Sequence, residues 1–375
     1  MDSPTSPVSL HWGKHERTVL VIQGGGALGA YQAGVYMGLV ENGMEADWVA
    51  GVSIGAINAA LIAGNPPERR LERLHEFWNR MSTPTPIMFP GALSMLRPMV
   101  NRAHAGRAAL FGVPGFFVPR PLPPALAPDG SMAALSYYDT QPLVATLTDL
   151  IDFDLINQKH TRLSLGAANV KNGSSVYFDN TKMRIGPEHV MASSALPPAF
   201  PPVEIDGELY WDGGIVSNSP LTYVMDEAYR SDVLIFQVDL FSGVGASPRN
   251  LDQVVERHKD IQYASKQRVN ISRLQEFEET RAALARLIDK LPAALQSDPD
   301  VLRLKTRSTR GELTLVHFVN QHDTASSYFK DCEFSATTVR ELWSAGQHDV
   351  RASMTRPELR QTIELGHGLR FYDAT

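Results

Sequence analysis

The stretch TVLVIQGGGALGAYQAGVYMGL, residues 18–39, constrains the fold more than any other part of the sequence. Residues 18–23 are apolar and β-branched enough for a short buried strand, and residues 27–39 have the alanine-rich, 3.6-residue period of a packed helix. Glycines between them let the chain turn sharply. A second strand, residues 48–53, is followed by an alanine-rich helix that ends at residue 64. Two strand-turn-helix units in succession predict an α/β fold with a mainly parallel sheet.

The glycine turn is compatible with two functions. Gly24, Gly26 and Gly29 have the G-x-G-x-x-G spacing of a dinucleotide site. The same geometry suits a loop whose amides hold the oxyanion of an ester-cleaving enzyme. A dinucleotide site requires an acidic residue at the end of the second strand, about 20 residues beyond the glycines. That strand ends at Ser53, and the nearest acid, Asp47, precedes it. The sequence therefore disfavours the dinucleotide interpretation.

Ser53 is the candidate nucleophile, because Gly51 and Gly55 complete a G-x-S-x-G pattern around it. At such an elbow, small flanking residues let strand and helix approach closely while the serine oxygen projects from the strand end. The helix that follows points its positive end at this turn, so the amides of Ser53 and Ile54 are further candidate donors to a developing charge.

The base that would activate Ser53 is the harder assignment. The eleven histidines show no telling local context, and no zinc-binding pattern such as H-E-x-x-H occurs. Asp212, in the sequence GELYWDGG, precedes two glycines just after an aromatic run. This aspartate is the candidate base, although Asp-Gly-Gly is also typical of an ordinary turn.

The whole chain divides into three parts, and the middle part contains an insertion. Residues 1–17 are expected to form a flexible tail, and residues 18–240 a catalytic domain with further strands at 162–170, 175–180 and 232–240. Within it, residues 82–128 carry four arginines and no acidic residue among apolar and proline-rich stretches. Such an insertion favours a lid or a binding loop that contacts an anionic lipid surface, with a subunit contact or a simple cover as the alternative. Residues 241–375 are predicted to form a mainly helical extension that packs on the core, with one further strand at 312–319.

Composition excludes several classes of protein. A net charge of -6 and a pI near 6.0 argue against nucleic-acid binding. The single cysteine, Cys332, excludes an internal disulfide and a cysteine-rich metal site, and it fits a reducing cytosol. The N-terminus lacks the pattern of a secretory signal, and no uninterrupted apolar run is long enough for a membrane span. A cytoplasmic protein is expected, with peripheral membrane contact through residues 82–128 as an open alternative.

The motifs GGGALG, GVSIG and DGG occur in an order and at a spacing that resemble those of patatin-like lipid acyl hydrolases. The stretch MASSALPPAFPPVEIDGELYWDGG, residues 191–214, resembles the family's approach to its aspartate, and Asn218 and Pro220 resemble the segment that follows. The resemblance covers residues 18–240. The stretch FSATTVRELWSAG, residues 334–346, is similar to the uncharacterised C-terminal region of some bacterial patatin-like proteins.

This resemblance implies a three-layer α/β/α hydrolase in which Ser53 attacks an acyl carbonyl and Asp212 acts as its base without a histidine. It also implies that Gly24, Gly25 and Gly26 form the oxyanion loop, and that no metal or organic cofactor is needed. One departure is Leu28, at a position where many members carry a cation. Because an aspartate is normally a weak base, burial beside Tyr210 and Trp211 is expected to raise the pKa of Asp212.

The function expected from these features is hydrolysis of carboxylic esters of lipids, including phospholipids, through an acyl-enzyme. Hydrophobic esters without phosphate, including short polyesters, are the near alternative, because Leu28 removes a cation that would favour an anionic headgroup. An inactive protein that binds a membrane or a partner is the alternative from another class. A homo-oligomer is left open.

Overall fold

The computed structural model describes residues 15–84, 97–228, 232–308, 311, 313–322, 330–356 and 369–374. Most of the expected N-terminal tail and the middle of the 82–128 insertion, residues 85–96, lie outside this part of the chain. The strands are β1 (Arg17–Ile22), β2 (Trp48–Val52), β3 (Val118–Pro119), β4 (Tyr138–Asp139), β5 (Arg162–Asn169), β6 (Ser175–Asp179), β7 (Val203–Ile205), β8 (Glu208–Asp212), β9 (Val233–Asp239), β10 (Leu313–Val319) and β11 (Leu369–Asp373).

The helices follow the strands in the alternating order of an α/β protein. They are α1 (Gly29–Glu41), α2 (Ile54–Ala63), α3 (Pro67–Met81), α4 (Arg97–Phe111), α5 (Gln141–Leu150), α6 (Phe153–Asn157), α7 (Pro187–Ser193), α8 (Leu221–Glu227), α9 (Leu251–Asp289), α10 (Pro299–Ser308) and α11 (Ala336–Met354). All the strands predicted from the sequence are present at nearly the predicted bounds.

One sheet forms the centre of the described structure, with the strand order β11-β10-β9-β1-β2-β5-β8-β7 and with β6 paired to β5. The strands from β11 to β5 are parallel to their neighbours, whereas β6, β7 and β8 pair antiparallel. A mainly parallel α/β sheet is therefore confirmed.

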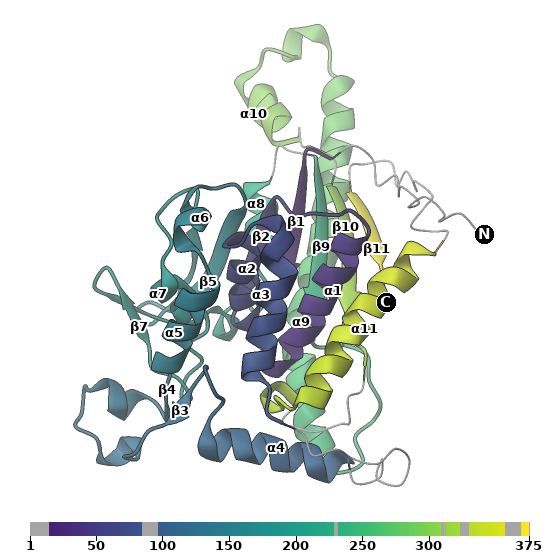
Figure 1. Cartoon of the computed structure of the whole chain (residues 1–375). Coiled ribbons are helices and arrows are strands. Elements are labelled where there is room, and N and C mark those ends of the chain that lie inside the picture. Colours follow the sequence, from purple (N-terminus) through teal and green to yellow (C-terminus); the bar gives the residue numbers. More distant parts are fainter. Residues whose placement is uncertain are drawn as a thin grey trace.

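Helices cover both faces of this sheet, because successive side chains of a strand point to opposite sides. Along β1, Leu20 and Ile22 pack in the larger core with α1, α2, α3 and α11. Val19 and Val21 pack in a second core with α8. Figure 1 shows α1, α2, α3 and α11 lying together over one face. The arrangement is the three-layer α/β/α architecture expected from the sequence.

Residues 241–375 contribute to this same sheet as well as to its helical cover. β10 pairs with β9 in parallel and β11 pairs with β10, so the sheet continues past residue 240 without interruption. Helix α11 packs so closely on α1 that a Cβ on Gly34 would lie 2.0 Å from the carbonyl oxygen of Trp343. The long helix α9 runs past the sheet and projects beyond it with α10 (Figure 1). The extension thus contains two strands in addition to its helices, and it shares the core.

Candidate active site

The register of β5 brings Ser53 and Asp212 together. β6 occupies one edge of β5 along residues 164–168, so β2 and β8 share the other edge. β2 ends beside Gly166, and the antiparallel β8 ends with Asp212 beside Ala167, the next residue of β5. The two strands therefore meet end to end, and Ser53, which follows β2, lies at this junction.

Ser53 lies in a strained turn between β2 and α2. Its backbone has φ 58 and ψ -128, a conformation that residues other than glycine rarely adopt. Gly51 and Gly55 permit the turn, because a Cβ on Gly51 would lie 2.3 Å from the carbonyl oxygen of Gly55. The amide of Ser53 donates to the carbonyl oxygen of Ser193 at 3.1 Å, so it does not serve as the additional oxyanion donor expected from the sequence.

Asp212 is almost completely buried and only partly hydrogen-bonded. Its Oδ1 atom accepts from the amide of Gly214 at 2.7 Å. Burial raises the pKa of Asp212 to about 6, although the neighbouring Ser53 hydroxyl and the Gly214 amide lower it in part. The Oδ2 atom has no partner at ordinary hydrogen-bond geometry among the described residues. The Ser53 contact is therefore longer or less well aligned than a full hydrogen bond.

The predicted direction of the Asp212 pKa agrees with the structure, but the neighbours differ from the expected ones. Adjacent side chains in β8 point to opposite faces, so Trp211 does not lie on the face of Asp212. Tyr210 packs against Phe178, with ring centroids 5.2 Å apart. The glycine loop and Asn218 line the same cavity as Asp212.

The glycine loop lies directly against Ser53. A Cβ on Gly24 would lie 2.9 Å from the Cβ of Ser53, so any side chain there would displace the serine. The amide of Gly24 donates to the carbonyl oxygen of Asn218 at 3.2 Å, and the Asn218 side chain donates back to the Gly24 carbonyl at 3.0 Å. Two hydrogen bonds to Asn218 therefore hold Gly24 in place.

Gly25 and Gly26 remain as amide donors in this loop. Neither amide donates to any residue that the structure describes, and both residues line the cavity that contains Ser53. Gly26 has a φ of 56, a left-handed conformation that favours glycine. Of the three glycines assigned to the oxyanion loop from the sequence, two are free to bind an oxyanion.

An apolar cavity of about 230 Å³ opens above the pair. Ser53 and Asp212 lie on its wall, and aromatic rings form much of the rest. They come from distant parts of the chain: Phe116 and Phe117 from the 82–128 insertion, Phe200 from the approach to β7, and Phe334 from the C-terminal region. None of the described residues that line it is a histidine, lysine or arginine.

A larger cavity of about 500 Å³ lies beside Leu28 and Leu240 and is lined by charged and polar side chains. It contains neither Ser53 nor Asp212, so its size does not make it the reactive site. Leu28 itself is buried, with 1% of its surface exposed, and supplies no charge at the position where a cation is common.

Three of the described histidines have hydrogen-bond partners away from Ser53. His317 contacts Asp239 at 2.7 Å, His322 contacts Asp349 at 3.0 Å, and His189 accepts from the amide of Gly186. Within the described ranges, no group of three His, Cys, Asp or Glu residues has the arrangement of a metal site. In the same part of the chain, no helix combines the length and the apolar character needed to cross a bilayer.

Sequence reasoning missed the contribution of the C-terminal region to this site. Tyr263, Asp331, Cys332 and Phe334 all line the cavity with Ser53. The sequence signal is weak, because in this region only the stretch beginning at Phe334 resembles a known family, and that resemblance implies no role for its residues.

Comparisons with known proteins agree with these motifs. A family model described as patatin-like phospholipase matches residues 20–225, and a second, described as patatin phospholipase, matches residues 261–364. No curated protein gives a significant match.

Two solved structures are similar at low identity. VipD from Legionella pneumophila is 14% identical with a TM-score of 0.36, over 88% of this chain and 67% of that one. A chain of the heterodimeric ExoU–SpcU complex of the type III secretion system of Pseudomonas aeruginosa is 16% identical with a TM-score of 0.29, over 93% and 78%. These scores are too low to carry an argument.

Proposed function

Since the chain belongs to the patatin-like phospholipase family, whose model matches residues 20–225, we propose that it is a serine acyl hydrolase that cleaves carboxylic esters of lipids through Ser53 and Asp212. The observation that carries this proposal is the meeting of a strained serine with a buried aspartate of raised pKa at the wall of an apolar cavity. The absence of histidine among the described cavity residues supports direct activation by the carboxylate.

The proposed reaction has two balanced steps. Ser53 Oγ forms a bond to the ester carbonyl carbon while its proton moves to Asp212 Oδ2, and the amides of Gly25 and Gly26 stabilise the oxyanion. Collapse breaks the bond to the alcohol, which takes the proton from Asp212. Water then attacks the acyl group on Ser53, Asp212 accepts the proton of that water, and the carboxylic acid leaves as the serine regains its hydrogen.

A fluorophosphonate probe tests this assignment, because it reacts with an activated serine. Labelling of the wild type, followed by peptide mass mapping, is expected at Ser53. The label should vanish in Ser53→Ala and fall sharply in Asp212→Asn. A folded wild-type protein that does not react would contradict the proposal and favour an inactive binding protein.

A second candidate substrate class is favoured by the charge of the cavity. The absence of lysine and arginine among its described lining residues, together with the buried Leu28, leaves no cation there for a phosphate group. Hydrophobic esters without phosphate therefore compete with phospholipids as substrates. Comparing a phosphatidylcholine with a neutral diacylglycerol of the same acyl chains, both in matched detergent micelles, separates the two classes.

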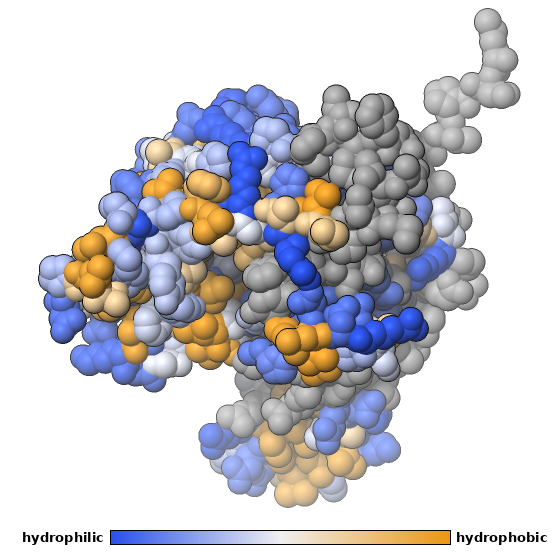
Figure 2. Space-filling model, turned by 90° about the horizontal axis from the view of Figure 1, so that it is seen from below, coloured by the Kyte–Doolittle hydropathy of each residue, from blue (hydrophilic) through white to orange (hydrophobic). Residues whose placement is uncertain are grey.

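The 82–128 insertion supports contact with a lipid surface. In α4, Ala105 and Ala108 are buried and line the cavity, whereas Met99 and Leu110 point away and are 68% and 71% exposed. Figure 2 shows apolar side chains gathered in separate patches on the face of the molecule that carries α4. We propose that this helix covers the acyl site and rests on the lipid that supplies the substrate.

This contact is testable with vesicles. Wild type should cosediment with anionic vesicles, and Leu110→Glu should reduce binding and hydrolysis of vesicle lipid while keeping hydrolysis of a monomeric ester. Equal vesicle binding by both proteins would contradict the surface assigned to α4.

A further inference from the structure

The C-terminal region reaches the glycine loop through the short helical turn η7 (Lys330–Cys332). This turn lies against η1 (Gly26–Leu28), which continues the glycine loop. A Cβ on Gly26 would lie 2.1 Å from the carbonyl oxygen of Asp331, so the two backbones are in direct contact. The position of Asp331 therefore limits the position of Gly26.

Among the described elements, η7 packs against η1 and α4, and its side chains make ion pairs with α9. On its C-terminal side, the amide of Thr83 donates to the carbonyl oxygen of Phe334 at 2.8 Å. Its own side chains reach α9. Lys259 Nζ lies 2.8 Å from both carboxylate oxygens of Asp331, and Lys330 Nζ lies 2.6 Å from Asp260 Oδ1. Two side chains of the turn thus make ion pairs with the same helix, α9.

The Lys259–Asp331 pair differs from an ordinary surface ion pair in burial and in position. Its side chains are only 22% and 20% exposed, and the lysine contacts both oxygens of the carboxylate. Exposed pairs typically contribute little, because water screens them and the side chains lose freedom. In this pair, the backbone carbonyl oxygen of Asp331 also contacts Gly26, in the glycine loop beside Ser53.

The other contacts of the glycine loop leave the position of Gly26 dependent on its contact with Asp331. Gly24 is held by Asn218, and the amide of Leu28 donates to the carbonyl of Gly25 at 3.2 Å. Gly26, with its left-handed backbone, lies between these two points and is pressed by Asp331. An oxyanion hole works only if its donors are held in place before charge develops, and a displacement of about 1 Å can cost about 100-fold in rate.

We propose that Lys259 and Asp331 are positioning residues of the oxyanion hole, whose ion pair holds the Asp331 carbonyl against Gly26 and so fixes the amides of Gly25 and Gly26. This inference rests on the proposed hydrolase function. It gives the C-terminal region a role in catalysis, because α9 and η7 then complete a site whose nucleophile and base lie in residues 18–240.

The test measures kcat per active site on the full-length chain, with active sites counted by fluorophosphonate titration. Lys259→Met should lower kcat per titrated site by about 10- to 100-fold while KM for a monomeric ester changes by less than about twofold. Lys259→Arg should recover most of the rate. The exchanged pair Lys259→Asp with Asp331→Lys should recover part of it.

Lys182→Met is the matched control. It removes a lysine whose Nζ lies 2.7 Å from Glu227 Oε1, in an ion pair away from the cavity. This variant should keep the wild-type kcat per titrated site.

Three outcomes would overturn the inference. Wild-type kcat per titrated site in Lys259→Met would show that the ion pair does not position the donors. A lower melting temperature or fewer titratable sites, with kcat per site unchanged, would assign the pair a structural role only. A wild type that does not react with the probe would overturn the hydrolase proposal and this inference with it, whereas a reactive wild type tests the inference alone.

Discussion

Two buried aspartates flank β5, and they have opposite electrostatic environments. Asp179 ends β6 beside Ser164, near the start of β5, whereas Asp212 ends β8 beside Ala167. Both carboxylates are at most 1% exposed. The pKa of Asp179 is lowered to about 2, and the pKa of Asp212 is raised to about 6. Burial alone therefore does not decide how a carboxylate behaves.

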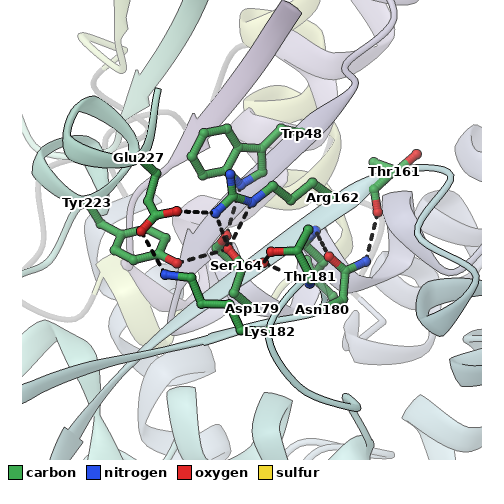
Figure 3. A network of polar contacts seen from close by, with 11 residues as sticks. Trp48, Thr161, Arg162, Ser164, Asp179, Asn180, Thr181, Lys182, Tyr223 and Glu227 are labelled. Carbon is green, nitrogen blue, oxygen red and sulfur yellow. Dashed lines mark hydrogen bonds and ion pairs between the residues drawn. The ribbon is translucent and has the colours of Figure 1, made fainter. Parts of the chain in front are cut away.

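The difference comes from how completely each carboxylate is hydrogen-bonded. Burial raises the pKa of Asp179, but Arg162, Thr181 and Ser164 donate to it and outweigh that effect. Figure 3 shows this network, in which Tyr223 also donates at 2.9 Å. The Arg162 guanidinium stacks 3.9 Å above the Trp48 ring. Each acceptor is used, so the group is stable and unreactive.

Asp212 has the opposite arrangement. One oxygen accepts from the Gly214 amide and the other has no full hydrogen bond among the described residues. A buried carboxylate with a free oxygen binds a proton more strongly than usual, which is what a base beside an alcohol requires. The proposed function therefore predicts that reactivity at this sheet depends on leaving one carboxylate oxygen of Asp212 without a full hydrogen bond. Five predictions test it, starting with the largest effect.

Asp212→Asn should lower kcat by about 10⁴-fold, because the amide keeps the shape of the carboxyl but cannot accept the serine proton. The rate is measured with a monomeric ester at pH 8, alongside the melting temperature. Since the substitution removes a buried charge, the protein should remain folded. A folded variant with near wild-type kcat would show that Asp212 is not the base.

Asp179→Asn should destabilise the protein by about 3 kcal/mol, because it leaves the charge of Arg162 without its main partner in a largely buried site. Chemical denaturation measures the loss, and kcat per titrated site should stay within about twofold of wild type. Asp154→Asn, which removes an exposed partner of Arg184, is the control and should change stability by less than about 1 kcal/mol. A large loss of kcat per titrated site in Asp179→Asn would contradict the assignment of stability to Asp179 and of reactivity to Asp212.

The pH dependence of kcat/KM should report the ionisation of Asp212 and not that of Asp179. Because Asp212 must be deprotonated to act as a base, kcat/KM should fall about tenfold per pH unit below about pH 6 and level off above it. A profile that follows an ionisation near 3.8, the ordinary value for an aspartate, would exclude burial as the tuning mechanism.

The contributions of Asp212 and Asp179 to folding stability should change in opposite directions with pH. The folded pKa of Asp212 exceeds its ordinary value of 3.8, so its contribution to stability is lost as pH rises from about 4 to 6. The folded pKa of Asp179 lies below that value, so its contribution is lost as pH falls from about 4 to 2. Denaturation of Asp212→Asn between pH 4 and 8 should therefore show a gain over wild type that grows with pH, up to about 3 kcal/mol.

The smallest expected effect is that of Tyr223→Phe. The ring stays stacked on Tyr177, at a centroid distance of 4.1 Å, while the hydrogen bond to Asp179 is lost. A cost of about 1 kcal/mol is expected, because the carboxylate keeps its other donors. Denaturation measures it, and a loss as large as that of Asp179→Asn would mean that the hydroxyl, not Arg162, dominates this network.

The sequence was most informative where function depends on local geometry. The strand-glycine-helix units predicted the parallel sheet, and the pattern around Ser53 predicted a strained elbow that the backbone angles bear out. The choice of Asp212 depended on resemblance, since Asp-Gly-Gly alone is also an ordinary turn. The sequence grouped Gly24 with Gly25 and Gly26, but it did not indicate that the Gly24 amide donates to the carbonyl oxygen of Asn218, far away in the sequence.

By itself, the sequence determined the α/β class, the elbow and the glycine loop, because strand period, helix period and glycine position act over a few residues. Only the tertiary structure decided which residues enclose the site. The pairing of β8 beside the end of β2 aligns Asp212 with Ser53, and the crossing of α9 behind η7 brings Asp331 to Gly26. Such contacts join segments that are 72 or more residues apart, and their formation depends on how the whole chain packs rather than on any local preference.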